Sequence, residues 1–363
     1  MLKQLLKKTV QSILIARLAL KSARFPSFDY FRVLMRNIRI CKQRRYTPIE
    51  AFRLGFFSKH FDTSLIDKFT SRKVLTKIQE RLNHPSWAEL AKNKAIFYSY
   101  CLQAKIRVPQ WYVVSTSERL FWDCYNNRML SCLKSKIEFI KRYLPSKFVI
   151  KPIRGAYGVR VVIINKTSKG FKDTEGNFYS ASDIVEYLQA RYPEGFIIQQ
   201  RVENHPAIVA LTGIDALQTA RIISLIDNEK KCRIIHAHFK PITKLRVFID
   251  THLQGLTGNV EVPIDIEKGT LGAGNQITST GQGIITISKH PITGKSFQDF
   301  KLPVWHEACD MVKEAAYKFL PIRAIGWDVA LTPSGPRIIE ANIWWDPPNQ
   351  HMRMDEMLKE MSH

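Results

Sequence analysis

The chain has 363 residues, of which 45% are hydrophobic, and a formal net charge of +23. This length allows two or three packed units, and the ordinary apolar content argues against a disordered or collagen-like chain. The sequence contains no run of eighteen apolar residues, so it predicts no membrane-spanning helix. The six cysteines form no Cys-x-x-Cys pair, so we expect no zinc ribbon or disulfide framework and a cytoplasmic location.

Much of the positive charge lies in residues 1–50, which carry twelve Lys or Arg residues against only Asp29 and Glu50. Leucine and isoleucine recur at roughly helical spacing within residues 1–20, and the basic residues among them argue against a cleaved signal peptide. Two interpretations remain open: a basic helix lying on an anionic membrane, or a surface helix packed on its own domain. We expect residues 1–45 to contact the inner face of the cell membrane peripherally, and we expect no nucleic-acid partner.

Residues 30–90 read as helical, with breaks at Pro48 and Pro85. From residue 91 the pattern predicts a helix, a turn at Pro109 and a strand. The strands predicted after these are 147–152, 158–164, 196–202, 220–226 and 234–239. Two further helices are predicted around 181–191 and 303–319. This mixture predicts an α+β fold.

The segment KFVIKPIRGAYGVRVVII at 147–164 has a strand that ends at Lys151, a loop with Gly155 and Gly158, and a second strand that starts near Val159. Such a loop can cover a polyphosphate with backbone N–H groups and a lysine. An ordinary hairpin with a basic edge would look similar.

The segment FIIQQRVENHP at 196–206 is an apolar strand that turns abruptly polar. It could be a hinge whose backbone pairs with an adenine edge, or an ordinary strand end.

Two apolar strands at 326–331 and 336–343 flank a Thr-Pro-Ser-Gly turn and predict a β-hairpin that contains three polar residues. Glu340 and Asn342 point to one face of their strand, and Asp328 can face the same side from the neighbouring strand. Buried carboxylates are costly unless they are paired or bind a metal. Three oxygen ligands on one face suit Mg²⁺, which we favour over a polar rim on an edge strand.

His236 and His238 alternate on one strand and could bind zinc, but no third ligand stands at metal spacing. Ordinary core or surface histidines are the favoured interpretation.

Together these segments resemble the ATP-grasp superfamily and, more narrowly, its sugar-transfer-associated, alpha-L-glutamate ligase-related family. The segments that carry the resemblance are 93–109, 147–164, 199–211, 220–226, 262–272, 289–305 and 326–346. The resemblance covers about residues 90–348 and implies two α+β lobes that clasp ATP. The expected divisions are a basic helical N-terminal region (1–90), an entry segment (91–135), a small lobe (136–210) and a large lobe (211–363).

The resemblance also implies roles for individual residues. Two lysines and the glycine loop would bind ATP phosphates and a hinge would bind adenine, namely Lys94, Lys151, Arg154, Gly155, Gly158, Gln200, Arg201 and Val202. Glu203 is the candidate for the ribose hydroxyls. Asp328, Glu340 and Asn342 would bind Mg²⁺ or Mn²⁺. We expect no site residue before Lys94.

Two positions depart from the pattern of the better-known ligases of the superfamily. Position 93 is Asn, where Asp is commoner. Those ligases carry an arginine two residues before the metal-binding aspartate, where this chain has Gly326. A catalytic arginine would then have to be Arg221 or Arg246.

The function implied is that of an ATP-dependent carboxylate–amine ligase acting through an acylphosphate, on small-molecule or glycan-linked substrates of a surface polysaccharide. Phosphoryl transfer needs positioning and charge neutralisation rather than a protein nucleophile, so the chemistry fits these residues. Two alternatives stay open: a kinase that phosphorylates a sugar or other hydroxyl, and a non-catalytic basic binding protein.

Overall fold

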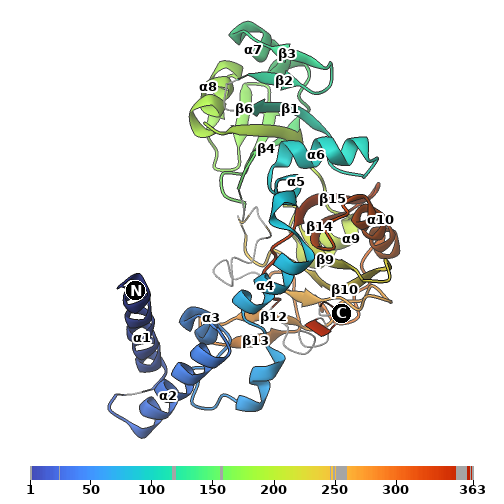
Figure 1. Ribbon diagram of the computed structural model, residues 1–363. Coiled ribbons are helices and arrows are strands. Elements are labelled where there is room, and N and C mark those ends of the chain that lie inside the picture. Colours follow the sequence, from blue (N-terminus) through green and yellow to red (C-terminus); the bar gives the residue numbers. More distant parts are fainter. Residues whose placement is uncertain are drawn as a thin grey trace.

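The computed structural model describes residues 2–23, 25–116, 120–155, 158–245, 247, 250, 260–348, 358–359 and 361. Helices and strands both contribute large parts of the fold, which confirms the α+β prediction (Figure 1). Within the described ranges, every helix is too short or too polar to cross a membrane.

The N-terminal region is helical, as predicted. Its elements are α1 (Leu2–Ser22), α2 (Phe28–Gln43), α3 (Pro48–Arg53), a 3₁₀ turn (Thr63–Lys68), α4 (Arg72–Leu82), a second 3₁₀ turn (Pro85–Trp87) and α5 (Glu89–Lys92). Pro48 and Pro85 stand at the first positions of their elements, where a missing N–H group costs nothing. A capping box between Thr47 and Glu50 fixes the start of α3.

Helix α1 packs against its own region. Ile15, Leu18 and Ala19 are buried in a phenylalanine-rich core that α2 and α3 share, whereas Ile13 and Leu20 are exposed. The described part of the helix is therefore a packed surface helix, which was one of the two interpretations of the sequence.

An eight-stranded antiparallel sheet forms the upper part of Figure 1, in the order β3-β2-β1-β8-β4-β5-β6-β7. Its strands are β1 (Trp111–Thr116), β2 (Phe121–Asp123), β3 (Arg128–Leu130), β4 (Lys147–Pro152), β5 (Val162–Thr167), β6 (Gly170–Asp173), β7 (Phe178–Tyr179) and β8 (Gly195–Gln200). Helices α7 (Leu133–Arg142) and α8 (Ala181–Arg191) pack on it, and α6 (Lys94–Gln103) precedes it. The strand predicted to start near Val159 begins only at Val162, because residues 158–161 form a turn closed by a hydrogen bond from Val161 N–H to the Gly158 carbonyl.

A five-stranded sheet in the order β11-β10-β9-β14-β15 forms the second half. Its strands are β9 (Thr219–Ile226), β10 (Cys232–Phe239), β11 (Val262–Pro263), β14 (Ala324–Thr332) and β15 (Gly335–Asn342). The remaining elements are α9 (Pro206–Thr212), α10 (Trp305–Lys318) and a two-stranded sheet of β12 (Gly274–Ile277) and β13 (Ile284–Ile287). Strands β14 and β15 form the predicted hairpin.

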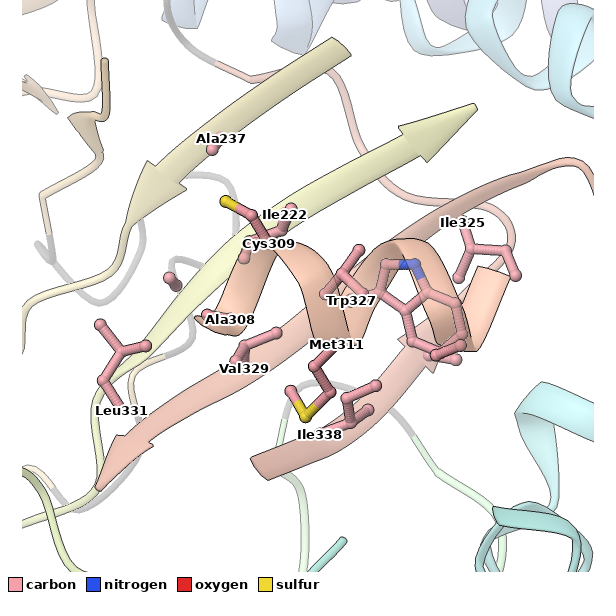
Figure 2. Packing of buried hydrophobic residues seen from close by; sticks show 14 of the residues in the cluster. Ile222, Ala237, Ala308, Cys309, Met311, Ile325, Trp327, Val329, Leu331 and Ile338 are labelled. Atoms are coloured by element: carbon pink, nitrogen blue, oxygen red, sulfur yellow. The ribbon is translucent and has the colours of Figure 1, made fainter. Parts of the chain in front are cut away.

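Helix α10 covers one face of the five-stranded sheet (Figure 2). Met311 packs with Ile338, while the fully buried Trp327 donates its indole N–H to Ser224 Oγ at 2.8 Å. Truncation of a buried tryptophan typically costs about 3–5 kcal/mol, so this face is a major source of stability. Because side chains alternate along a strand, Asp328 lies on the opposite face from Trp327.

Candidate active site

Four polar residues stand in one row across the five-stranded sheet. His238 pairs with Arg221, Arg221 with Asp328, and Asp328 with Glu340, each on an adjacent strand. Residues directly opposite each other in a sheet share a face, and Asn342 follows two residues after Glu340. The register thus brings together the three predicted metal ligands and one of the two candidate arginines.

Asp328 is held by two cations. Arg221 donates from Nε to Asp328 Oδ1 at 2.7 Å and from Nη2 to Oδ2 at 3.1 Å, while Lys240 Nζ lies 3.0 Å from Oδ1. Only 7% of Asp328 is exposed. Burial alone would raise the pKa of this carboxyl, but Arg221 and Lys240 outweigh it and hold the pKa well below its usual range. The carboxylate is therefore ionised.

Lys240 also connects to a second carboxylate. Its Nζ lies 3.4 Å from Asp250 Oδ2, which accepts a hydrogen bond from the Thr219 backbone N–H at 2.8 Å. Lys240 therefore bridges two acids at the edge of the row.

His238 is a neutral member of the row. Burial, followed by the neighbouring His236 and then by the charges of Arg221 and Lys240, lowers the pKa of His238 well below its usual value. His236 Nε2 lies 3.2 Å from His238 Nδ1. Within the described part of the chain, no three His, Cys, Asp or Glu side chains gather in a metal-binding group.

The start of α6 brings a lysine to the end of β4. The Asn93 side chain caps α6 by accepting from the backbone N–H groups of Ala95 and Ile96, and the Lys94 N–H donates to the Ile153 carbonyl at 2.9 Å. This docking places Lys94 close to Lys151 on β4.

Lys94 connects the glycine loop to the hairpin. Its Nζ donates to the Gly155 carbonyl at 3.0 Å and lies 3.2 Å from Glu340 Oε1. For the half-buried Lys151, burial lowers the pKa to about 8, with Glu340 raising it and Lys94 lowering it further. Two lysines and a carboxylate thus meet between the two sheets.

The described ends of the loop and the start of the predicted hinge both have irregular backbone. Gly155 and Gly158 adopt positive φ angles of 148° and 69°, which favour glycine. Strand β8 ends at Gln200, whose N–H donates to the Gln110 carbonyl, and the chain continues outside the sheet from Arg201.

A cavity of about 350 Å³ joins these groups. The predicted residues that line it are Lys94, Lys151, Gly155, Gly158, Gln200, Arg201, Val202, Arg221, Asp328, Glu340 and Asn342. Their assignment to ATP and metal stays a prediction, but the fold does bring them together.

Three predicted residues are not part of this group. Arg154 points to Glu89, with 2.6 Å between Nη2 and Oε2. The exposed Glu203 lines a separate hollow together with Tyr112. Arg246 lies outside the described residues.

Sequence reasoning missed several residues of the cavity wall. Lys240 and His238 could have been found from the sequence, because polar residues alternate at 236, 238 and 240 and therefore share one face of β10 and its continuation. No sequence pattern pointed to Asp250, since it stands in a loop beyond the strand. The expectation that no site residue precedes Lys94 does not hold for the cavity wall, which also includes Glu50, Arg53, Leu54, Phe69, Thr70 and Arg72.

The hairpin residues fit a divalent cation. Two carboxylates and an amide on one face of neighbouring strands offer the hard oxygen ligands that Mg²⁺ and Mn²⁺ prefer. Asn342 Nδ2 lies 3.4 Å from Asp328 Oδ2, so the amide and that carboxylate are close enough to share an ion.

The packing around position 326 explains why glycine stands there. A Cβ atom at this position would lie 2.9 Å from Trp345 Cδ1 and 3.3 Å from Arg221 Cδ. Space that a side chain at 326 would need is thus already filled, partly by Arg221.

Comparison with known proteins gives a family match. The sequence model of a family described as sugar-transfer associated ATP-grasp matches residues 74–361. No curated protein sequence matches significantly.

The fold is similar to solved structures at low sequence identity. One is an L-amino acid ligase from Bacillus licheniformis, at 13% identity and a TM-score of 0.37, over 71% of this chain and 41% of that chain. A second is D-alanyl-alanine synthetase A from Vibrio cholerae O1 biovar eltor, at 9% identity and a TM-score of 0.42, over 77% of this chain and 62% of that chain. A third is the D-alanine-D-alanine ligase from Coxiella burnetii, at 9% identity and a TM-score of 0.39, over 76% of this chain and 57% of that chain. The match spans less than two thirds of each of these proteins.

Proposed function

Since the chain belongs to the sugar-transfer associated ATP-grasp family, we propose that it is an ATP- and Mg²⁺-dependent carboxylate–amine ligase. The observation that carries the proposal is the meeting of Lys94 and Lys151 with the row of Arg221, Asp328 and Glu340 in one cavity. Cations from one side and metal-binding carboxylates from the other are what a triphosphate requires.

The proposed reaction joins an acid and an amine. A substrate carboxylate oxygen attacks the γ-phosphorus of ATP, and ADP leaves. The amine then attacks the acyl carbon, phosphate leaves, and the amine loses a proton, so that the products are an amide, ADP and phosphate.

The residues of the chain bind and orient the reactants. Lys94 and Lys151 would neutralise phosphate charge, and backbone N–H groups of the loop around Gly155 and Gly158 would cover the phosphates. Residues 200–202 would bind adenine as the hinge. A divalent cation held by the β14–β15 hairpin would neutralise further charge on the phosphate oxygens.

Arg221 is the better supported of the two candidate catalytic arginines. Its guanidinium is fixed by two hydrogen bonds to Asp328 and lines the cavity. From there it would stabilise charge on the transferred phosphoryl group, as an arginine does in other phosphoryl transfers.

The acceptor and the site of action are further parts of the proposal. The family description supports a glycan-linked substrate, such as a component of a surface polysaccharide. The net charge of +23 supports work at the inner face of the membrane, in contact with anionic lipid.

The test is ADP release by the purified protein with panels of acids and amines, in the presence of Mg²⁺ and hydroxylamine. A ligase gives ADP together with a hydroxamate trapped from the acylphosphate. A stable phosphomonoester would identify the kinase alternative, and the absence of ADP release and of Mg²⁺-dependent ADP binding would favour a non-catalytic binding protein.

A further inference from the structure

The N-terminal region forms one end of the cavity although the family match begins only at residue 74. Two fully buried amides, one in α4 and one at its C-cap, fix this region to the hairpin. Gln79 Nε2 donates to the Trp345 carbonyl at 2.9 Å, and Asn83 Nδ2 donates to the Ala324 carbonyl at 2.7 Å. The wall is therefore built into the fold.

Two arginines and two carboxylates meet at this end. Arg72 Nε lies 2.8 Å from Asp346 Oδ1, and Glu50 Oε1 accepts the backbone N–H of Arg72 at 2.8 Å. Arg53 lines the cavity beside them, half-buried; burial lowers its pKa, while Glu50 and Asp346 raise it. Trp345 also lines this end, is 3% exposed, and has an indole Nε1 with no hydrogen-bond partner among the described residues.

The position of this cluster favours the second substrate over the nucleotide. A nucleotide that extends from the hinge at residues 200–202 to the hairpin ligands leaves free the end beyond Asn342. That end is formed by residues 344–346 and by Arg53 and Arg72.

We propose that this end of the cavity binds a small zwitterion of the amino-acid class, with its carboxylate at Arg53 and Arg72 and its ammonium group at Asp346. Guanidinium groups bind carboxylates in a bidentate manner, and the neighbouring acid complements the opposite charge. This inference rests on the proposed ligase, for which it names the class of one substrate.

The test uses calorimetry on the full chain with ADP and Mg²⁺ present. Alanine, serine, lysine and glutamate are compared with analogues that lack the amine or the carboxylate, such as propionate and ethylamine. At least one amino acid should bind about tenfold or more tightly than either analogue, and Arg53→Gln should reduce its affinity at least tenfold without changing ADP binding. The matched control is Arg39→Gln, an exposed arginine on α2.

Equal affinity for an amino acid and its analogues, unchanged affinity in Arg53→Gln, or no binding of the panel overturns the inference. A measurement of ADP binding distinguishes a failure of this inference from a failure of the proposed ligase function. If ADP does not bind to the wild-type protein, the ligase proposal itself fails.

A second observation concerns the outer face of the α1–α2 pair, at the lower left of Figure 1. The side chains of Phe28, Phe31, Met35 and Ile38 are 82%, 52%, 64% and 37% exposed. Their spacing of three, four and three residues places them in one stripe, opposite the buried Tyr30, Val33, Asn37 and Ile40.

Aromatic and basic side chains border the stripe. Phe25 is 57% exposed, and its ring lies 6.3 Å from that of Phe31 at the tip of the pair. Lys21, Arg32, Arg39 and Lys42 are exposed on the same two helices. An apolar stripe with a basic border fits an anionic bilayer, whereas nucleic acid would need the charge alone.

We infer that the stripe on α2, with the tip at Phe25, docks the protein on anionic lipid. This surface differs from the leucine pattern of residues 1–20, of which Leu18 is buried. Since α3 packs in the same core and also lines the cavity, docking would hold the active site near the membrane.

Co-sedimentation with phosphatidylglycerol and phosphatidylcholine vesicles tests this inference. Phe28→Ser and Met35→Ser together should weaken binding to phosphatidylglycerol vesicles about tenfold or more. Phe178→Ser, at a side chain on β7 that is 58% exposed, should not. Arg39→Gln should weaken binding by a few fold and less at high salt.

Equal binding to neutral vesicles, or no loss in the double variant, overturns the inference. A wild-type dimer that the double variant converts to a monomer would mean that a second copy covers the stripe. DNA binding with the same affinity in both proteins, without vesicle binding, would assign the basic border to nucleic acid.

Discussion

The two sheets that face the cavity contribute different kinds of group. Among the described residues of the eight-stranded sheet that line the cavity, Lys151 is the charged one, and it stands beside apolar side chains such as Val149 and Ile163. From the five-stranded sheet come charged side chains that are already paired, such as Asp328 with Arg221 and Lys240. We therefore expect substitutions in the eight-stranded sheet to change nucleotide binding or turnover, and substitutions in the five-stranded sheet to change the stability of the fold as well.

Loss of the Glu340 carboxylate should have the largest effect on activity. Glu340→Gln removes a proposed metal ligand and the partner of Lys94, but its side chain is 31% exposed and the apolar neighbours stay buried. We expect ADP release to fall by at least about a hundredfold while the circular dichroism spectrum and the melting midpoint stay near those of wild type.

Two results would refute this assignment. Wild-type turnover in Glu340→Gln would exclude the residue from the site. Full activity of the wild-type protein in EDTA would exclude the divalent cation.

Asp328 should matter for stability as well as for activity. Asp328→Asn leaves Arg221 and Lys240 in a poorly exposed site without the carboxylate that pairs with both. Removing one partner of a buried ion pair typically costs about 3–5 kcal/mol, so chemical denaturation should show a loss of that order.

The control for this effect is an exposed ion pair. Glu314→Gln breaks the contact with Lys318 on the surface of α10 and should leave the unfolding midpoint nearly unchanged, since exposed pairs contribute little. Equal losses in both variants would mean that the row across the sheet is no more than a surface network.

The lysines of the phosphate site should show smaller effects, confined to binding and turnover. Lys151→Ala and Lys94→Ala should each weaken ADP binding or slow turnover by about ten- to a hundredfold, because each removes a charge from a partly desolvated cleft. Lys166→Ala is the control, since Lys166 is exposed on β5 and donates to the Lys141 carbonyl. If all three variants behave alike, general basicity explains the lysines.

The sequence predicted the site best where local pattern and register coincide. Period-two alternation places Glu340 and Asn342 on one face of their strand, and the register of the hairpin adds Asp328 to that face. The α+β class and the helices near 181–191 and 303–319 were likewise visible in local periodicity.

What the sequence did not reveal depends on tertiary contacts. Arg72 reaches the cavity because α4 packs on β9 and β14 of the five-stranded sheet and because Arg72 pairs with Asp346, more than 270 positions later in the chain. Arg53 lines the cavity from α3, which packs in the core of the N-terminal helices. Asp250 reaches Lys240 from a loop without periodicity. The direction of the Arg154 side chain was also not visible in the sequence, since Gly155 beside it lines the cavity while Arg154 itself pairs with Glu89.

The smallest effect we expect is the pH dependence of nucleotide binding. Burial lowers the pKa of Lys151 to about 8 from an ordinary value of 10.5, so the free protein loses this charge as the pH rises through about 8. Phosphate groups are already ionised there, because their second pKa is about 6. ADP affinity should therefore be highest below pH 8 and fall by a few fold between pH 7 and 9.5, measured by calorimetry at constant Mg²⁺. Lys151→Arg keeps its charge over this range, so its affinity should stay flat. A flat wild-type profile, or the same decline in Lys151→Arg, would show that Lys151 does not face the phosphates.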